Sequence, residues 1–318
     1  MFGKTDNEPF TLWNPRSSLL HVTVSPTLIV KVLGENVFPI VIIVSLAAFK
    51  FSIKKAEKIK RYIFFIVFYL GCETTKINPL VLEFLYIYSM NDLLIECCAN
   101  SIESAINGEN GGAHRIELCR KLEVGGITSF HQDIIQAKKR INIPLHILIR
   151  PRAGDFVYTE NELKRMIHDI IFCKEATCDG VVIGALNPDG SINKKQCEQM
   201  IDAANGMHIT FHRAFDEANN LEQNLEDVIE CGCDSLLTAG QSKNVEEGFP
   251  KLETLVKLTN NRINILAGSG VNVANVESLY QIGIRSFHLS GSELTTSGKM
   301  ETSTKKIRAV VEKLNALA

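Results

Sequence analysis

This sequence has little tryptophan, little proline and almost no net charge. Its 318 residues include one Trp and nine Pro, and its formal net charge is only −2. With 45% hydrophobic residues and so little net charge, the chain is not mainly disordered. Its length suffices for one large domain or two ordinary ones. A nearly neutral chain also lacks the positive surface that nucleic acids attract, so we expect no nucleic-acid partner.

Paired metal-binding motifs are missing, although cysteine itself is not. The chain has nine Cys, but no C-x-x-C pair followed by a second one, which argues against a structural zinc site. An odd number of cysteines in a long chain, without the short spacing of a disulfide scaffold, indicates reduced thiols. We therefore expect a cytoplasmic location.

Glycine is nearly absent from the first part of the chain. Residues 1–89 hold 3 of the 21 Gly, 9 of the 16 Phe and the only Trp, Trp13. Their basic minus acidic residues give 10 − 6 = +4, whereas residues 90–318 give 24 − 30 = −6. This change of composition predicts a boundary between two parts that need separate explanations.

A run of apolar residues long enough to span a membrane is also missing from residues 1–89. The runs Val37–Phe49 and Tyr62–Cys72 flank the basic stretch Lys54–Arg61, and both are shorter than the ~18–20 residues that a spanning helix needs. We expect an apolar and basic extension of uncertain structure outside the main domain, either spurious sequence upstream of a start at Met90 or poorly ordered. A membrane-associated segment and a genuine folded domain remain the alternatives.

From Asp92 onward, short apolar runs alternate with helical patterns. The predicted strands are Leu93–Cys98, Arg115–Cys119, Leu145–Arg150, Gly180–Ala185, His208–Phe215, Ser235–Ala239, Ile263–Ala267 and Ser286–Ser290. The predicted helices are Ser101–Asn107, Gln132–Lys139, Glu160–Glu175, Lys194–Ala204, Leu221–Cys231, Val245–Thr259, Ala274–Ile282 and Thr302–Leu317. Eight such units predict an α/β fold, a TIM-type (β/α)8 barrel. An open sheet would carry a G-x-G-x-x-G loop after its first strand, and no glycine follows Cys98 there.

Alternation along these strands places polar residues on the inward faces. The residues with this parity include Glu96, Cys98, Arg115, Glu117, Cys119, His146, Arg150, Thr210, His212, Leu236, Thr238 and His288. Because charged groups are costly inside a barrel unless they are paired, we expect Glu96 and Glu117 to meet Arg150, Arg152 and His212 at one mouth. The cluster could be a site or a structural network of ion pairs.

Four motifs carry a family resemblance. They are Ile95–Cys98, Gly112–Cys119, Ile149–Phe156 and Thr210–Asp216. Together they resemble the CutC copper homeostasis family, over about residues 93–291 and not over residues 1–89. The resemblance implies a TIM-type barrel in the cytoplasm, with a link to copper tolerance and Cu(I) binding but no agreed reaction. This sequence departs from the family at Ser129, where Pro is usual, at Ala153 in place of Gly, and at Ala239 in place of Gly or Ser.

The first hypothesis for a site is Cu(I) binding by Cys98 and Cys119. Both match cysteines that the resemblance associates with copper. They lie on neighbouring strands with the same parity, ~4.8 Å apart, so their sulfurs can face each other. Two thiolates suit the soft Cu(I) ion. We expect Cys97, with the opposite parity, to pack outward under a helix, and the cysteines of the later helical units to belong to the core.

The second hypothesis is a site for a small anionic or phosphorylated ligand. Glycine-rich turns after the last two strands could cradle an oxyanion, and two arginines could clamp it. The expected ligand-binding residues are Arg150, Arg152, Gly268, Gly270, Ser290 and Gly291. The expected acid, base and orienting residues are Glu96, Glu117, His212 and Asp216. The sequence names no reaction or substrate, and it leaves open whether the chain forms a homo-oligomer.

Overall fold

The computed structural model describes residues 19–23, 29–33, 93–296 and 298–318. The chain divides into two units, Met1–Ser89 and Met90–Ala318. In the first unit, strands β1 (Leu19–Thr23) and β2 (Ile29–Leu33) form an antiparallel pair.

The two apolar runs on which the interpretation of residues 1–89 depends, Val37–Phe49 and Tyr62–Cys72, lie outside the described residues. The interpretation of residues 1–89 as an extension outside the main domain therefore stays a prediction, as does the alternative of a membrane-associated segment. Within the described part of the chain, no helix is both long enough and apolar enough to cross a membrane.

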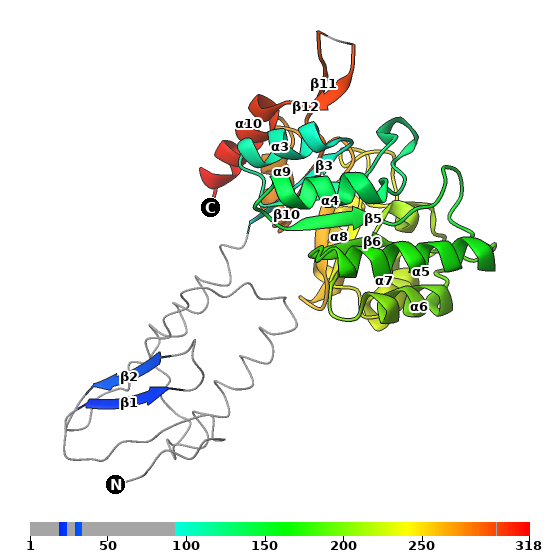
Figure 1. Ribbon diagram of the computed structural model, residues 1–318, viewed down its shortest axis with the longest axis horizontal. Coiled ribbons are helices and arrows are strands. Elements are labelled where there is room, and N and C mark those ends of the chain that lie inside the picture. The colour runs from blue at the N-terminus through cyan, green and yellow to red at the C-terminus, as the bar shows by residue number, and fades with distance from the viewer. Residues whose placement is uncertain (1–18, 24–28, 34–92, 297) are drawn as a thin grey trace. The chain divides into compact units, whose positions relative to one another are not determined.

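Eight parallel strands form a closed barrel in the second unit (Figure 1). They are β3 (Leu94–Ala99), β4 (Arg115–Leu118), β5 (Leu145–Leu148), β6 (Gly180–Ile183), β7 (His208–Phe211), β8 (Ser235–Thr238), β9 (Asn264–Gly268) and β10 (Ser286–Leu289). Each strand pairs with the next along the chain, and β10 returns to pair with β3, where His288 lies beside Glu96. The predicted TIM-type (β/α)8 barrel is confirmed.

Helices follow the strands and surround the barrel (Figure 1). They are α3 (Ile102–Asn110), α4 (His131–Arg140), α5 (Glu160–Glu175), α6 (Lys194–Ala204), α7 (Leu221–Glu230), α8 (Phe249–Thr259), α9 (Val276–Gln281) and α10 (Thr304–Asn315). The predicted bounds of α5 are confirmed because a capping box fixes its start. Thr159 Oγ1 accepts from the Glu162 backbone N–H, and Glu162 Oε2 accepts from the Thr159 backbone N–H.

The two largest errors among the predicted boundaries have local explanations. The fifth predicted strand ends early, because residues Arg213–Glu217 turn as a 3-10 helix in which His212 Nδ1 accepts from the Ala214 backbone N–H. Helix α8 begins at Phe249 and not at residue 245. The chain before it passes so close to β8 that a Cβ atom on Gly248 would lie 1.6 Å from the carbonyl oxygen of Ala239.

A β-hairpin that the sequence pattern did not predict lies between β10 and α10. Its strands are β11 (Ser292–Leu294) and β12 (Met300–Thr302). The Thr302 backbone N–H donates to Ser104 Oγ at 3.0 Å, and Asn107 Nδ2 donates to the Thr302 carbonyl at 3.1 Å. These bonds anchor the base of the hairpin on α3.

The larger apolar core lies between the barrel and its helices. Alternate strand residues point outward into it, among them Ile95, Cys97, Ile116, Ile147, Val181, Phe211, Leu236 and Phe287. The prediction that Leu236 and Thr238 face inward was wrong, since Leu236 belongs to this outer core. Ser235 instead lines the interior, with its Oγ 3.4 Å from His208 Nε2. A short run without apolar/polar alternation does not reveal which face is which.

Candidate functional site

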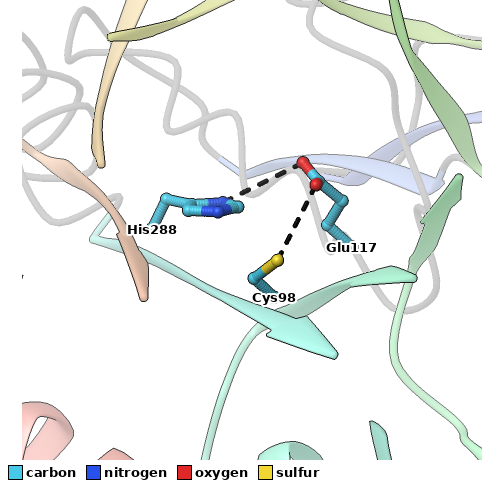
Figure 2. A group of neighbouring side chains, drawn as sticks. All are labelled: Cys98, Glu117 and His288. Carbon is cyan, nitrogen blue, oxygen red and sulfur yellow. Dashed lines mark hydrogen bonds and ion pairs between the residues drawn. The ribbon is translucent and has the colours of Figure 1, made fainter. Parts of the chain in front are cut away.

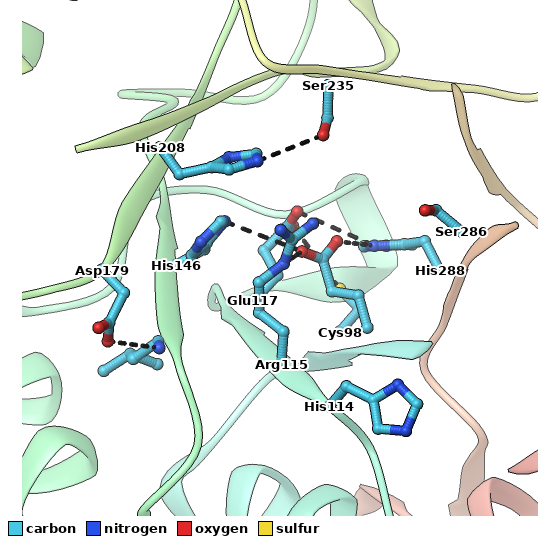
Figure 3. Close-up of polar contacts among 12 residues, drawn as sticks. Cys98, His114, Arg115, Glu117, His146, Asp179, His208, Ser235, Ser286 and His288 are labelled. Atoms are coloured by element: carbon cyan, nitrogen blue, oxygen red, sulfur yellow. Dashed lines mark hydrogen bonds and ion pairs between the residues drawn. The ribbon is translucent and has the colours of Figure 1, made fainter. Parts of the chain in front are cut away.

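Ionisable side chains fill the middle of the barrel (Figure 3). Glu96 comes from β3, Arg115 and Glu117 from β4, His146 from β5 and His288 from β10, and all five are buried. We call these five residues the central cluster. Their inward position follows from the alternation of side chains along each strand. Because buried charges are unfavourable unless they are compensated, the contacts within the cluster decide what it can do.

Glu96 is the fixed anion of the central cluster. Arg115 Nε donates to Glu96 Oε2 at 2.5 Å, and His288 Nδ1 lies 2.7 Å from Glu96 Oε1. Burial would raise the pKa of Glu96, but the charge of Arg115 and the hydrogen bond with His288 outweigh it and lower the pKa to about 2. Glu96 thus holds its two partners in place, and the predicted acid or base role does not fit it.

Glu117 is the carboxyl group best suited to exchange a proton. Burial, with a smaller contribution from the charge of Glu96, raises the pKa of Glu117 to about 7. Its Oε1 accepts a weak hydrogen bond from Cys98 Sγ at 3.9 Å, and His288 Nδ1 lies 4.0 Å from its Oε2 (Figure 2). Burial would lower the pKa of His288, but Glu117 and Glu96 outweigh it and raise that pKa. A carboxyl group that titrates near neutral pH can act as an acid or a base, which fits the prediction for Glu117.

Cys98 and Cys119 meet beside this carboxyl group. Cys98 lies on β3 and Cys119 directly follows β4, and the two Sγ atoms are 3.9 Å apart. Both are buried free thiols that pack against Leu148 and Val182. The hydrogen bond with Cys119, followed by burial, raises the pKa of Cys98 well above its usual value. The predicted proximity of the two sulfurs is confirmed. Because its pKa is raised, the Cys98 thiol stays protonated at neutral pH.

The remaining cysteines among the described residues belong to the packing of the fold. Cys97 points outward as predicted, and a Cβ atom on Gly108 of α3 would lie only 2.7 Å from its Sγ. The other buried cysteines are Cys173, Cys178, Cys197, Cys231 and Cys233. Their place in the outer core confirms the packing role predicted for them.

The two arginines of the predicted clamp are largely engaged within the chain. Arg150 NH1 donates to the carbonyl groups of Val124 and Gly126, each at 3.0 Å, and Arg150 NH2 donates to a third carbonyl at 2.7 Å. Arg152 pairs with Asp155 at 2.9 Å and with Glu162 at 2.6 Å. Only Nε of Arg150 is buried without a hydrogen-bond partner. The clamp could therefore use one N–H group without breaking existing bonds.

The predicted pair of His212 and Asp216 is wrong. Asp216 turns to the start of the β8–α8 loop, where its carboxylate accepts from Thr238 Oγ1 and from backbone N–H groups, and it pairs with Arg213 at 2.8 Å. His212 Nδ1 accepts from the Ala214 backbone N–H at 3.2 Å, which leaves the ring proton on Nε2. That Nε2 is buried without a partner, and burial lowers the pKa of His212 to about 3. His212 is therefore a neutral donor.

Packing explains the glycines of the predicted anion cradle. A Cβ atom on Gly268 would lie 2.5 Å from Leu237 Cδ1, and one on Gly291 would lie 2.8 Å from Ile307 Cδ1. Gly270 has a φ of +85°, which a residue with a side chain rarely adopts. Ser290 Oγ accepts from the Ser292 backbone N–H at 3.4 Å. The cradle itself remains a prediction.

Arg115, His146 and His288 are the residues of the central cluster that sequence reasoning did not assign to a site. Their parity was visible, because all three were placed on inward strand faces. The role of His288 depends on the closing pair of β3 and β10, which brings this residue to Glu96 across 192 positions of sequence. No local pattern in the sequence carries that information.

Comparison with known proteins gives consistent matches over the second unit. The sequence profile of the CutC family matches residues 93–293. A family protein CutC from Bacteroides fragilis is 41% identical over 211 residues, which cover 66% of this chain and 84% of that protein. A family protein CutC from Pasteurella multocida is 43% identical over 198 residues, which cover 62% of this chain and 81% of that protein.

Solved structures agree with these matches. The structure named as copper homeostasis protein CutC from Streptococcus agalactiae has a TM-score of 0.60 and 30% identity, and the match covers 62% of this chain and 98% of that one. The aldolase QR15 has a TM-score of 0.52 at 11% identity, with 72% of this chain and 98% of that one covered, and shares the fold alone.

Proposed function

This chain belongs to the CutC family, and on that premise we propose that it serves copper homeostasis by binding Cu(I) between the thiolates of Cys98 and Cys119. The copper ion is the cargo of the protein in this proposal. The similar Streptococcus agalactiae protein is also named for copper homeostasis, which supports the same reading here. We further propose a cytoplasmic location, since a reducing compartment keeps both thiols available.

The separation of the two sulfurs carries the proposal. Metal–thiolate bonds are ~2.3 Å long, so two sulfurs on opposite sides of one ion lie up to ~4.6 Å apart. The observed 3.9 Å needs only a small adjustment to reach that span. Soft thiolate ligands select Cu(I) over the hard cations of the cell. The apolar walls provided by Leu148 and Val182 keep water from the pair.

Proton release is part of this binding. Cu(I) needs both sulfurs as thiolates, whereas the pKa of Cys98 lies well above its usual value. Copper therefore competes with protons, and its affinity should rise with pH. Glu117, hydrogen-bonded to Cys98 Sγ at 3.9 Å, is placed to accept the proton that this thiol loses.

The test is Cu(I) binding to the reduced full chain, measured by competition with a Cu(I) chelator of known affinity. We expect one bound Cu(I) in the parent protein and at least a ~100-fold loss of affinity in the double variant Cys98→Ser/Cys119→Ser. The matched control is Cys231→Ser/Cys233→Ser, which removes two thiols from the outer core and should keep full affinity. Unchanged Cu(I) binding after loss of Cys98 and Cys119 would rule out this site.

A second candidate function, binding or conversion of a small anionic metabolite, has one observation in its favour. His212 Nε2 and Arg150 Nε are both buried N–H donors without hydrogen-bond partners, and the charge of Arg150 helps to lower the pKa of His212. Two such donors close together suit an oxyanion. In an enzyme of this kind, Glu117 would be the acid or base, while Arg152, Gly268, Gly270, Ser290 and Gly291 stay the predicted lining.

Phosphate is the probe for this second function. If it is correct, phosphate should raise the thermal midpoint of the parent protein, and His212→Asn, which keeps an acceptor for the Ala214 backbone N–H, should abolish the rise. The Cys98→Ser/Cys119→Ser variant should still respond to phosphate, which separates the two functions. No phosphate effect in the parent, at concentrations up to ~10 mM, would exclude the anion site.

A further inference from the structure

A second group of metal-ligating side chains lies between helices α4 and α5, on the outer layer of the fold. His131 is the first residue of α4, and His168 and Asp169 are neighbours on α5. His131 Nε2 lies 2.8 Å from Asp169 Oδ1, and His168 Nδ1 lies 4.0 Å from the same oxygen. One nitrogen from each histidine and one carboxylate oxygen all lie within 4.8 Å of one another. We call these three residues the helix-pair triad.

The surrounding packing fixes two of the three ligands. The ring of His131 stacks on Phe172, with 3.7 Å between centroids and 4° between ring planes. The side chain of Asp169 is only 12% exposed, so its carboxylate is held within the layer. The side chain of His168 is 75% exposed, so nothing packed around it prevents a rotation towards the other two. The triad thus combines two packed side chains with one exposed side chain close to them.

We propose that the helix-pair triad binds a divalent transition metal ion of the Zn²⁺ class. Ligand bonds of ~2.0–2.1 Å in a tetrahedral site place the donor atoms ~3.4 Å from one another. The two measured separations, 2.8 and 4.0 Å, lie on either side of that value. A small rotation of the exposed His168 ring, together with a small slide of the His131 ring along the face of Phe172, would bring both separations to that value.

The donor set determines the kind of metal. Two imidazole nitrogens and one carboxylate oxygen suit Zn²⁺, Ni²⁺ or Cu²⁺, whereas Cu(I) prefers thiolates. Three protein ligands leave a fourth position for water. This site is therefore chemically distinct from the cysteine pair inside the barrel, and it does not depend on the proposed copper function.

A hydrogen bond alone would explain only half of the arrangement. His131 and Asp169 already form one at 2.8 Å, which joins the two helices without a metal. It does not account for His168, whose ring stacks on that of His131 with 5.8 Å between the centroids and 22° between the ring planes. A third ligating side chain beside an existing imidazole–carboxylate pair is what a metal site requires.

The experiment uses Zn²⁺ and the full chain in the Cys98→Ser/Cys119→Ser background. This background matters because Cys98, Glu117 and His288 form the other group of three metal-ligating side chains found among the described residues. Calorimetry should detect one bound Zn²⁺. His168→Ala should weaken its affinity at least ~10-fold, because one of three ligands is lost. The matched control, Arg165→Ala, changes another exposed residue of α5 and should leave the affinity unchanged.

Two further measurements keep the proposal falsifiable. Co²⁺ in place of Zn²⁺ should give the visible absorption of a four-coordinate site without a sulfur charge-transfer band, and His131→Gln should remove it. In the same Cys98→Ser/Cys119→Ser background, Zn²⁺ should also raise the thermal midpoint, and His168→Ala should reduce this rise. Equal Zn²⁺ affinity in that background with and without His168→Ala would overturn the proposal and leave the His131–Asp169 contact as a hydrogen bond only.

Discussion

At the scale of single residues, the barrel interior sorts neighbouring groups into different protonation states. Glu96 stays ionised because Arg115 and His288 contact it directly, whereas Glu117, one strand away, has its pKa raised to about 7 by burial. His146 is kept neutral, since burial and the charge of Arg115 hold its pKa well below the usual value. Two neighbouring carboxyl groups whose pKa values lie far apart are typical of sites that transfer protons.

The buried neutral His212 should make the protein sensitive to acid. Its pKa is lowered from 6.5 to about 3, so between these values the unfolded chain binds more protons than the folded one. The free energy of unfolding must therefore fall as the pH drops through this window. We expect His212 to contribute a loss of about 2 kcal/mol between pH 6.5 and about pH 5, measured by urea unfolding.

The variant His212→Asn cannot take up this proton, so its stability should decrease less steeply over the same range. His168→Gln, at a largely exposed position, is the control and should follow the parent curve. A parallel decrease in His212→Asn and the parent would show that this ring does not titrate on unfolding.

At the scale of secondary-structure elements, local sequence patterns predict the alternation of strands and helices. Helices α5 and α6 begin and end where their patterns predict, because capping side chains at Thr159 and Asn193 mark the starts. The pattern fails at the run Ser235–Thr238, which has no polar alternation to set its face. It also misses the β11–β12 hairpin, whose anchor is a distant helix and not a local signal.

The close packing of α3 on β3 gives a prediction at this scale. Gly108→Ala would place a methyl group 2.7 Å from Cys97 Sγ and 3.0 Å from Ile116 Cδ1, so the helix or the strand must shift. We expect a loss of about 1–3 kcal/mol in the free energy of unfolding, although alanine is the better helix former.

Urea unfolding of the double variant Cys97→Ala/Gly108→Ala provides the check. Removing the sulfur relieves the nearest of these contacts, although Cys97 Cβ would still lie 2.9 Å from the methyl group, so the double variant should be moderately more stable than the sum of the two single changes predicts. Strict additivity would mean that the contact between α3 and β3 is not what requires glycine.

At the scale of the whole molecule, closure of the barrel completes the central cluster. The inward parity of most strands is predictable from sequence, and so is the meeting of Cys98 with Cys119 on neighbouring strands. The bond between Glu96 and His288 is not, because it depends on the first and last strands coming together. Neither is the loop contact of Asp216, since side chains that cap a distant loop leave no periodic signal in the chain.

The second unit should fold without the first. Its strands close on themselves between residues 94 and 289, and every described residue of the apolar core lies in the same unit. We expect residues 90–318 to unfold in a single cooperative transition and to retain Cu(I) binding, measured by circular dichroism and chelator competition. Insoluble or unfolded protein from this shorter chain would mean that residues 1–89 contribute to the fold.

The bond from His288 to Glu96 also has a consequence for biosynthesis. A ribosome releases β3 long before β10 has been made. In a nascent chain, Glu96 can therefore contact Arg115 before His288 has been synthesised. The open edges of such an incomplete sheet invite aggregation, and the long sequence separation slows ring closure. Production of this protein should therefore depend on chaperones that hold the emerging chain until its final strand arrives.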